Sequence, residues 1–178
     1  SSVRVRGFRN ARMAESHLFG PIVSRRLGRS LGVDVLPAKT CPFDCVYCEA
    51  GRTTTKTDRR QAFVDPEDVL SELSEFLAKG GGVDYVTISG SGEPTLYAGL
   101  GILIREIKKR FGVRVAVITN AALLSRPDVR AELTDADIVM PSLDSAREDS
   151  FRKVNRPVEG MTAESIVEGL SRFSREYK

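Results

Sequence analysis

Short runs of β-branched and aromatic residues alternate along the chain with longer segments of helical periodicity, and this alternation limits the fold more than any other feature. Strands that alternate with helices form βαβ units, whose right-handed crossovers build a parallel sheet. We predict an α/β fold, a partial (β/α) TIM-like barrel of parallel strands with outer helices and about four βα units. The predicted strands are residues 31–36, 83–88, 113–118 and 138–140.

The predicted helices are marked by their ends as well as by their apolar stripes. Asp65, followed by a proline and two acidic residues, should cap the first helix. A second helix over 100–111 should end at Gly112. A short third helix is expected to have Ser125 as its cap, and a last helix carries an apolar stripe over residues 166–173.

Polar residues follow each of the four predicted strands. In parallel α/β folds the active site lies at the carboxyl ends of the strands. One or two polar loops at that edge arise by chance, but four together indicate a site. The segments that the prediction brings there are 39–41, 89–93, 119–120 and 142–144.

Three cysteines, Cys41, Cys45 and Cys48, lie in the first of these segments and just after it. An odd number of cysteines argues against a disulfide framework. A structural zinc site normally needs four protein ligands, and the single histidine, His17, is far upstream, so a Cys3His zinc site stays open as an alternative. A redox Cys-x-x-Cys pair would leave Cys41 without a role.

An iron–sulfur cluster accounts for the three cysteines better than zinc does. Such clusters are normally bound by four thiolates. Three thiolates leave one iron with an open position, and an open position on a metal is what substrate chemistry requires.

The net charge is only +3, but the excess of basic residues lies in the first third of the chain. We expect residues 1–30 to form an irregular basic segment. It could attract phosphates, although a solvated arm is the simpler interpretation, and its arginines do not alternate with aromatic residues as in a single-strand binding surface. No apolar run approaches the roughly 20 residues of a membrane helix, and no signal peptide is visible. The expected compartment is the reducing cytoplasm.

The spacing Cys41-x3-Cys45-x2-Cys48 resembles the signature of the radical S-adenosylmethionine (SAM) superfamily. Other segments are similar to the Fe–S oxidoreductase group related to the tRNA wyosine-synthesis enzymes: 24–34, 89–96, 119–124, 142–144 and 155–157. The resemblance covers residues 19–175. It implies a [4Fe–4S] cluster on the three cysteines and SAM as the second cofactor. Wyosine-synthesis enzymes carry additional N-terminal cysteines that this chain lacks, so their tRNA reaction is not carried over directly.

The resemblance also implies a set of SAM contacts. Tyr47 matches a position that packs near adenine, with a half-buried loop aromatic as the alternative. Residues 90–94 resemble the Gly-Gly-Glu-Pro motif that receives the SAM amino group, with Ser91 in place of its first glycine. Thr119 and three other polar residues match contacts to ribose and to the methionyl carboxylate, or are cap and turn residues. The implied cofactor-binding residues are Tyr47, Gly90, Ser91, Gly92, Glu93, Asn120, Ser142 and Asp144.

The activity that the resemblance implies is radical chemistry. In the superfamily the reduced cluster cleaves SAM to a 5′-deoxyadenosyl radical, which abstracts hydrogen from a substrate. We therefore expect a radical SAM oxidoreductase or transferase of unknown substrate, with RNA as a candidate and a flavodoxin- or ferredoxin-type electron donor. The alternative is a non-catalytic α/β binding domain stabilised by zinc or by a cluster. Arg25, Arg26 and Arg156 are candidates for an anionic substrate, or for ion pairs.

The predicted organisation is a basic N-terminal extension over residues 1–30 and a radical SAM core over residues 31–178. The superfamily barrel has six βα units. We therefore expect the core to stop before the last two units, and the fourth strand to form an open edge.

Overall fold

The structure, a computed structural model, describes residues 16–177. Its centre is a five-stranded sheet in the order β1-β2-β5-β6-β7. Strand β1 is antiparallel to β2, and the four strands from β2 to β7 are parallel. The strands of this sheet are β1 (Leu18–Ser24), β2 (Gly28–Val33), β5 (Tyr85–Ile88), β6 (Arg114–Thr119) and β7 (Ile138–Pro141).

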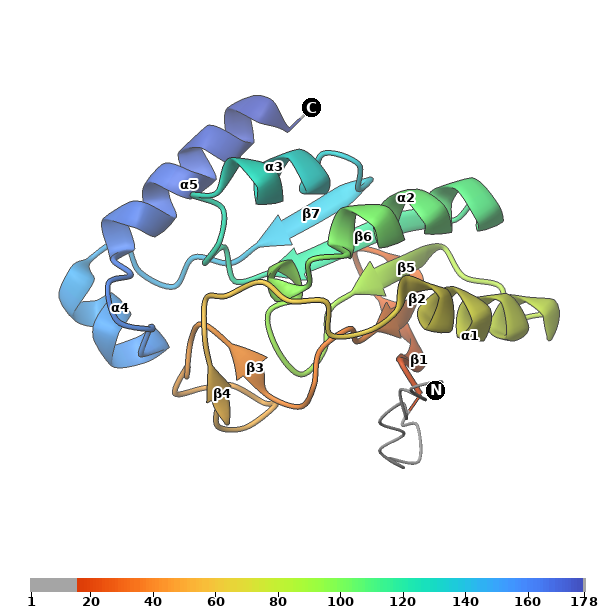
Figure 1. Cartoon of the computed structure of the whole chain (residues 1–178), viewed down its shortest axis with the longest axis horizontal. Helices are drawn as coiled ribbons and strands as arrows, with labels where there is room; N and C mark the ends of the chain where they lie inside the picture. The colour runs from red at the N-terminus through yellow and green to blue at the C-terminus, as the bar shows by residue number, and fades with distance from the viewer. Residues whose placement is uncertain (1–15, 178) are drawn as a thin grey trace, which may run out of the picture.

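A second, two-stranded sheet lies beyond the carboxyl ends of the first (Figure 1). It is made of β3 (Thr40–Cys41) and β4 (Thr55–Lys56), which pair in parallel. The helices follow the strands in chain order: α1 (Pro66–Ala78), the short 3-10 helix η1 (Pro94–Leu96), α2 (Leu100–Phe111), α3 (Pro127–Leu133), α4 (Glu148–Asn155) and α5 (Ala163–Glu176).

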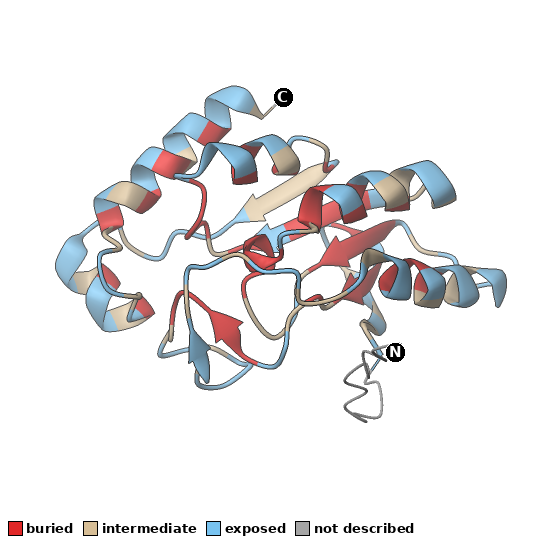
Figure 2. Ribbon diagram, in the orientation of Figure 1, coloured by how far each residue is buried: buried red, intermediate tan, exposed pale blue. Residues whose placement is uncertain are grey.

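The main core lies between the five-stranded sheet and its helices. Alternate strand residues such as Val33, Ile88 and Val117 join one cluster with apolar residues of α1, α2, α3 and α5. Figure 2 shows the buried residues along the sheet-facing sides of these helices, with exposed residues outside. The other face of the sheet holds a smaller cluster centred on Tyr85 and Ala116. Strands β5 and β6 thus carry buried side chains on both faces, as is typical of parallel strands.

These elements confirm the predicted α/β fold with four parallel strands and helices between them. Within residues 16–177 the sheet is open, with β7 at one edge as expected. Asp65 caps α1 by accepting a hydrogen bond from the Glu67 N–H, and α2 ends at Gly112, whose φ of 64° suits a glycine. None of the described helices is long and apolar enough to cross a membrane.

Two local predictions are wrong, and one helix was not predicted. Residues 18–24 and 28–33 form a β-hairpin, not an irregular segment, although residues 1–15 lie outside the described part of the chain. Helix α3 is preceded by Arg126 and has no side-chain cap, so Ser125 does not serve as one. Its first residue, Pro127, has no N–H, which reduces the number of unpaired donors at this helix start by one. The helix that was not predicted is α4, which follows β7. It buries one apolar residue, Phe151, so the sequence shows no apolar stripe there.

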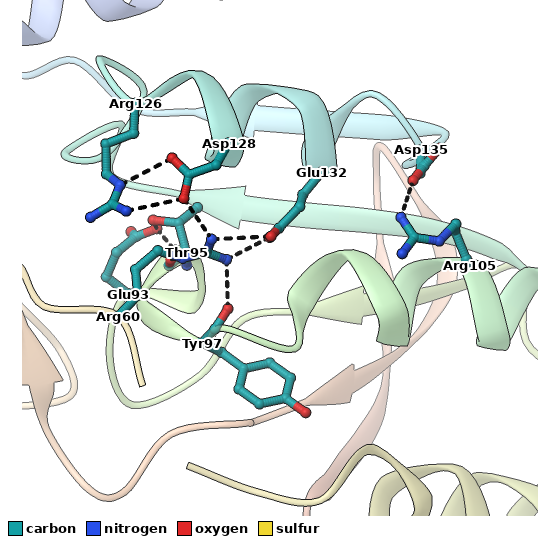
Figure 3. A network of polar contacts seen from close by, with 9 residues as sticks. All are labelled: Arg60, Glu93, Thr95, Tyr97, Arg105, Arg126, Asp128, Glu132 and Asp135. Atoms are coloured by element: carbon teal, nitrogen blue, oxygen red, sulfur yellow. Dashed lines mark hydrogen bonds and ion pairs between the residues drawn. The ribbon is translucent and has the colours of Figure 1, made fainter. Parts of the chain in front are cut away.

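Arg60 ties the segment after β5 to α3. Its guanidinium donates to the backbone carbonyls of Thr95 and Tyr97, at 2.9 Å each, and to the carboxylates of Asp128 and Glu132 (Figure 3). The Arg60 side chain is only 9% exposed. Because a guanidinium presents five donors in a fixed plane, one side chain can hold both carbonyls and both carboxylates.

We expect Arg60→Met to lower the free energy of unfolding by about 3 kcal/mol, since it leaves Glu132 and two carbonyls without their donor. Chemical denaturation measures the loss. Arg105→Met is the matched control, because Arg105 forms an exposed pair with Asp135 in the same region and should cost less than about 1 kcal/mol (Figure 3). Equal losses in both variants would contradict this account.

Candidate functional site

The carboxyl ends of the parallel strands lie at one edge of the sheet, because residues at or near the ends of neighbouring strands pair with each other. Val33 of β2 pairs with Ile88 of β5, and Ile88 pairs with Val117 of β6. The residues that follow these positions therefore emerge side by side. In Figure 1 the arrowheads of β5, β6 and β7 point towards the side where β3, β4 and α4 lie. This side also carries residues 41–48, which we call the cysteine loop.

A cavity of about 200 Å³ joins the cysteine loop to these strand ends, and we call it the strand-end cavity. Cys41, Cys45, Cys48 and Tyr47 line it from the loop. The residues that line it after β5, β6 and β7 include Gly90, Gly92, Glu93, Thr119, Asn120 and Ser142. The predicted convergence of cysteines and polar strand ends is therefore present in one place.

A second cavity, of about 310 Å³, borders the cysteine loop as well. Its lining includes Cys45, Cys48, Arg52 and Arg156, but neither Cys41 nor any strand end. Although it is the larger of the two, the strand-end cavity is the better candidate site. That cavity alone of these two gathers all three thiols with the polar residues that follow the strands.

Each of the three cysteines has a nitrogen donor near its sulfur. The Asn120 amide is 3.3 Å from Cys41 Sγ, the Asn155 amide is 3.4 Å from Cys45 Sγ, and the Lys39 ammonium is 2.9 Å from Cys48 Sγ. Burial raises the pKa of the Cys41 thiol to about 12, and burial also raises the pKa of Cys45. Burial thus disfavours the thiolate form of Cys41 and Cys45, and the nearby donors oppose this effect.

Helix α4 and the turn after it hold the cysteine loop in place through the backbone. The Asp44 N–H donates to the Asn155 carbonyl at 2.9 Å, and the Val46 N–H donates to the Val154 carbonyl at 2.9 Å. Phe43 packs edge-on against Phe151 of α4, with 5.4 Å between ring centroids. These carbonyls end a helix and have no partner within it, so the loop N–H groups satisfy them.

The glycines after β5 allow the chain to pass close to its neighbours. Gly90 has a φ of 129°, and a Cβ on it would lie 2.4 Å from Cγ of Asp34. A Cβ on Gly92 would lie 2.0 Å from the Thr40 carbonyl oxygen. Asp34 then accepts a hydrogen bond from the Ser91 N–H at 2.8 Å. This turn is therefore pressed against the start of the cysteine loop.

Glu93 is 2% exposed, and its carboxylate is bound by the protein itself. Oε1 accepts from the Thr95 N–H, the Thr95 hydroxyl and the Thr119 hydroxyl, and Oε2 accepts from the Asn120 N–H at 2.7 Å. Burial raises the pKa of Glu93, and these donors oppose that rise. The carboxylate thus fastens the end of β5 to the end of β6, with acceptor capacity left on Oε2.

Two residues of the predicted SAM-contact set do not line the strand-end cavity. Ser91 is one of them, and its N–H is bound to Asp34. Asp144 is the other, and its carboxylate accepts from the Tyr47 hydroxyl and from the Asn155 amide, at 2.5 Å each. The structure therefore brings Tyr47, Gly90, Gly92, Glu93, Asn120 and Ser142 to the cavity and holds the other two beside it.

Sequence reasoning assigned no role to three residues that shape the site: Asp34, Lys39 and Asn155. All three fall in segments that the sequence singled out, next to the motif residues. Asn155 is 2% exposed, and its Oδ1 is buried without a hydrogen-bond partner. The sequence could have drawn attention to these polar residues because they lie in segments already singled out. It could not show which residues they contact, since those partners are distant in the sequence or are set by the fold.

The three arginine candidates lie in two different places. Arg25 and Arg26 are exposed in the turn between β1 and β2, at the amino end of β2 and thus opposite the strand ends. Arg156 lies beside the cysteine loop, 3.8 Å from Asp44, which also faces Arg52. Their charges hold the pKa of Asp44 below its usual range, after the larger effect of the Thr53 N–H.

His17 does not line either cavity that borders the cysteine loop, and its Nδ1 lies 3.2 Å from the Asp34 carbonyl oxygen. Among residues 16–177, no three His, Cys, Asp or Glu side chains are close enough together to hold a single metal ion. The geometry therefore gives no support to a Cys3His zinc site.

We expect Gly92→Ala to lower the free energy of unfolding by about 1–3 kcal/mol, because the added methyl group would overlap the Thr40 carbonyl. Urea denaturation measures this loss. Gly82→Ala is the control, since a Cβ there meets nothing within 4 Å. If Gly92→Ala were as stable as the wild type, the claim that the Gly92 backbone lies against the Thr40 carbonyl would be contradicted.

The model of the radical SAM superfamily matches residues 35–178 of this chain. A protein of Brachyspira hyodysenteriae named GTPase Obg is 39% identical over 168 residues, which cover 94% of this chain and 25% of that protein. A UPF0026 protein of Methanocaldococcus jannaschii is 41% identical over 162 residues, covering 90% of this chain and 50% of that protein. The crystal structure of archaeal TYW1 matches with a TM-score of 0.54 at 22% identity, covering 84% of this chain and 52% of that one, which shows a like fold. This chain spans about half the length, or less, of each protein.

Proposed function

Because this chain belongs to the radical SAM superfamily, we propose that it is the part of an enzyme that binds the cluster and SAM and carries out radical chemistry on a substrate. Members of the superfamily use a [4Fe–4S] cluster and SAM. When bound, these two groups supply the electron and the organic radical that abstracts hydrogen. The observation that carries the proposal is the strand-end cavity, in which three thiols face the ends of three parallel strands.

The residues of the cysteine loop fit a cubane cluster. In a cubane each thiolate binds a different iron, so the sulfurs stand further apart than the ligands of one ion. This is compatible with cysteines that share a cavity without forming a single-ion site. We propose Cys41, Cys45 and Cys48 as the ligands. The donors at their sulfurs, Asn120 and Asn155 among them, are of the kind that tunes cluster potentials.

The residues at the strand ends suit a ligand with amino, carboxylate and hydroxyl groups. Asn120 and Ser142 are the proposed contacts for ribose or carboxylate oxygens, and the backbone at Gly90 and Gly92, which lines the cavity, is the proposed contact for the amino group. Glu93 would reach SAM through Oε2, while its Oε1 is used by the protein.

Three residues of the predicted SAM-contact set remain: Tyr47, which lines the cavity, and Asp144 and Ser91, which lie beside it. Tyr47 is 57% exposed and lines the cavity, so its ring is available to a purine. The Tyr47 hydroxyl donates a hydrogen bond to Asp144, which thereby orients the ring. Ser91 acts through its backbone, which Asp34 fixes. Asp144 and Ser91 are therefore proposed as supports of the SAM site in this structure, although the motif match implied direct contact.

The electron is proposed to come from a donor of the flavodoxin or ferredoxin type. RNA stays a candidate substrate on the basic character of the first third of the chain, and Arg156 is the one of the three arginine candidates that lies beside the cysteine loop. A reducing cytoplasm is the proposed location, because all three cysteines are free thiols that must remain reduced to bind a cluster.

Anaerobic reconstitution of the wild type should give about four iron atoms per chain with matching sulfide. Cys45→Ala should lose the cluster and its visible absorbance, because one of three ligands is removed. Val46→Ala, a change to an exposed residue of the same loop, should keep both. Full iron content in Cys45→Ala, or zinc in place of iron in the wild type, would contradict the proposal.

Ser142→Ala should weaken SAM binding to the reconstituted protein roughly two- to twelvefold, the effect of losing one hydrogen bond. Equilibrium dialysis under anaerobic conditions measures the affinity, and the EPR spectrum of the reduced cluster shows whether SAM still reaches it. Ser145→Ala is the control, because Ser145 follows the same strand but lies outside the cavity. Unchanged affinity in Ser142→Ala would remove this residue from the site.

A further inference from the structure

Lys39 is a buried cation two residues before the cysteine loop. Its side chain and backbone together are 7% exposed. Its φ is 55°, a left-handed conformation that is uncommon outside glycine. The Lys39 carbonyl accepts hydrogen bonds from the N–H groups of both Thr54 and Thr55, at 3.1 Å each. The backbone of Lys39 is therefore held by the start of the neighbouring strand β4.

The ammonium group of Lys39 faces the thiols. Its Nζ lies 2.9 Å from Cys48 Sγ, and Lys39 also lines the strand-end cavity. Its charge reaches Cys41 too, where it opposes the rise in pKa that burial causes. Among the buried polar residues of the described part of the chain, Arg130 is the other cation. Its guanidinium is bound to Glu176 and to the carbonyls of Leu124 and Ser125.

A buried ammonium is costly unless an anion compensates for it. A neutral thiol is a weak acceptor and compensates little, whereas a thiolate accepts a charge-assisted hydrogen bond. A sulfur that binds iron carries negative charge, so the ammonium of Lys39, 2.9 Å from Cys48 Sγ, would be compensated by a bound cluster. Lys39 belongs neither to the three-cysteine spacing nor to the motif at residues 90–94, so neither pattern assigns it a role.

We infer that Lys39 is a positioning residue that donates to the Cys48 thiolate and raises the reduction potential of the cluster. The inference rests on the proposed function, because it takes the three cysteines as cluster ligands. Reduction adds one electron from an external donor and hence one negative charge. A fixed cation beside a ligand sulfur favours the state with more negative charge.

The test uses Lys39→Met, which removes the charge and keeps most of the side-chain volume, and Lys39→Arg, which keeps the charge. A redox titration with dithionite, followed by EPR without SAM, gives the midpoint potential of each reconstituted protein. At the wild-type midpoint we expect Lys39→Met to show at least a tenfold lower ratio of reduced to oxidised cluster, which is a shift of about 59 mV to more negative potential. Lys39→Arg should shift less. Lys56→Met is the control, because it removes the same charge from the exposed neighbouring strand β4.

The outcomes separate this inference from the proposed function. A wild type without a cluster would refute the proposed function. A loaded Lys39→Met with the wild-type potential would overturn the inference alone, and a fall in SAM affinity at unchanged potential would instead place Lys39 among the SAM contacts. If Lys39→Met does not load iron, Lys39→Gln is compared with Lys39→Arg. Iron retained in the arginine variant and lost from both uncharged ones supports the need for a cation, and loss from all three overturns it.

Discussion

The buried carboxylate of Glu93 is the interaction on which the geometry of the site depends. It draws its donors from Thr95, which lies after β5, from Thr119, which ends β6, and from Asn120, which follows it. Parallel strands do not fix the loops that leave them, so an additional contact must hold those loops together. With Glu93 in place, the Asn120 side chain is directed to Cys41 and the turn at Gly92 is pressed against Thr40. One acidic side chain thus sets the distance between the strand ends and the cysteine loop.

The cysteine loop depends on a second contact, with the end of α4. Its N–H groups at positions 44 and 46 bind carbonyls that a helix leaves free at its last turn. Asn155 continues this contact with its side chain, which donates to both Asp144 and Cys45. The cysteine loop is therefore held by backbone bonds to α4 as well as by the short strand β3 at its start, and both contacts restrict how far its three sulfurs can move relative to one another.

Much of this architecture could be predicted from the sequence. The four parallel strands followed from their β-branched runs, and the site edge followed from the rule that parallel strands deliver their carboxyl ends together. The hairpin at β1 and β2 was missed because its residues carry several arginines and glycines and show no clean alternation. Helix α4 was missed because it buries little apolar surface and is held by backbone contacts, which leave no periodic pattern. Lys39 and Asn155 were missed for a related reason: their partners are thiols 9 and 110 residues away.

The contact between the cysteine loop and α4 also has a consequence for the order in which the protein is made. Residues 42–46 are synthesised early, but the carbonyls of Val154 and Asn155 and the N–H of Val158, which bind them, come more than 100 residues later. During synthesis the three thiols therefore stand exposed on an incompletely held loop while the sheet behind them forms strand by strand. The site closes only after residue 158 has left the ribosome. If the three cysteines are the cluster ligands proposed above, the closed site could hold a cluster only from that point on, and the thiols would have to stay reduced until then.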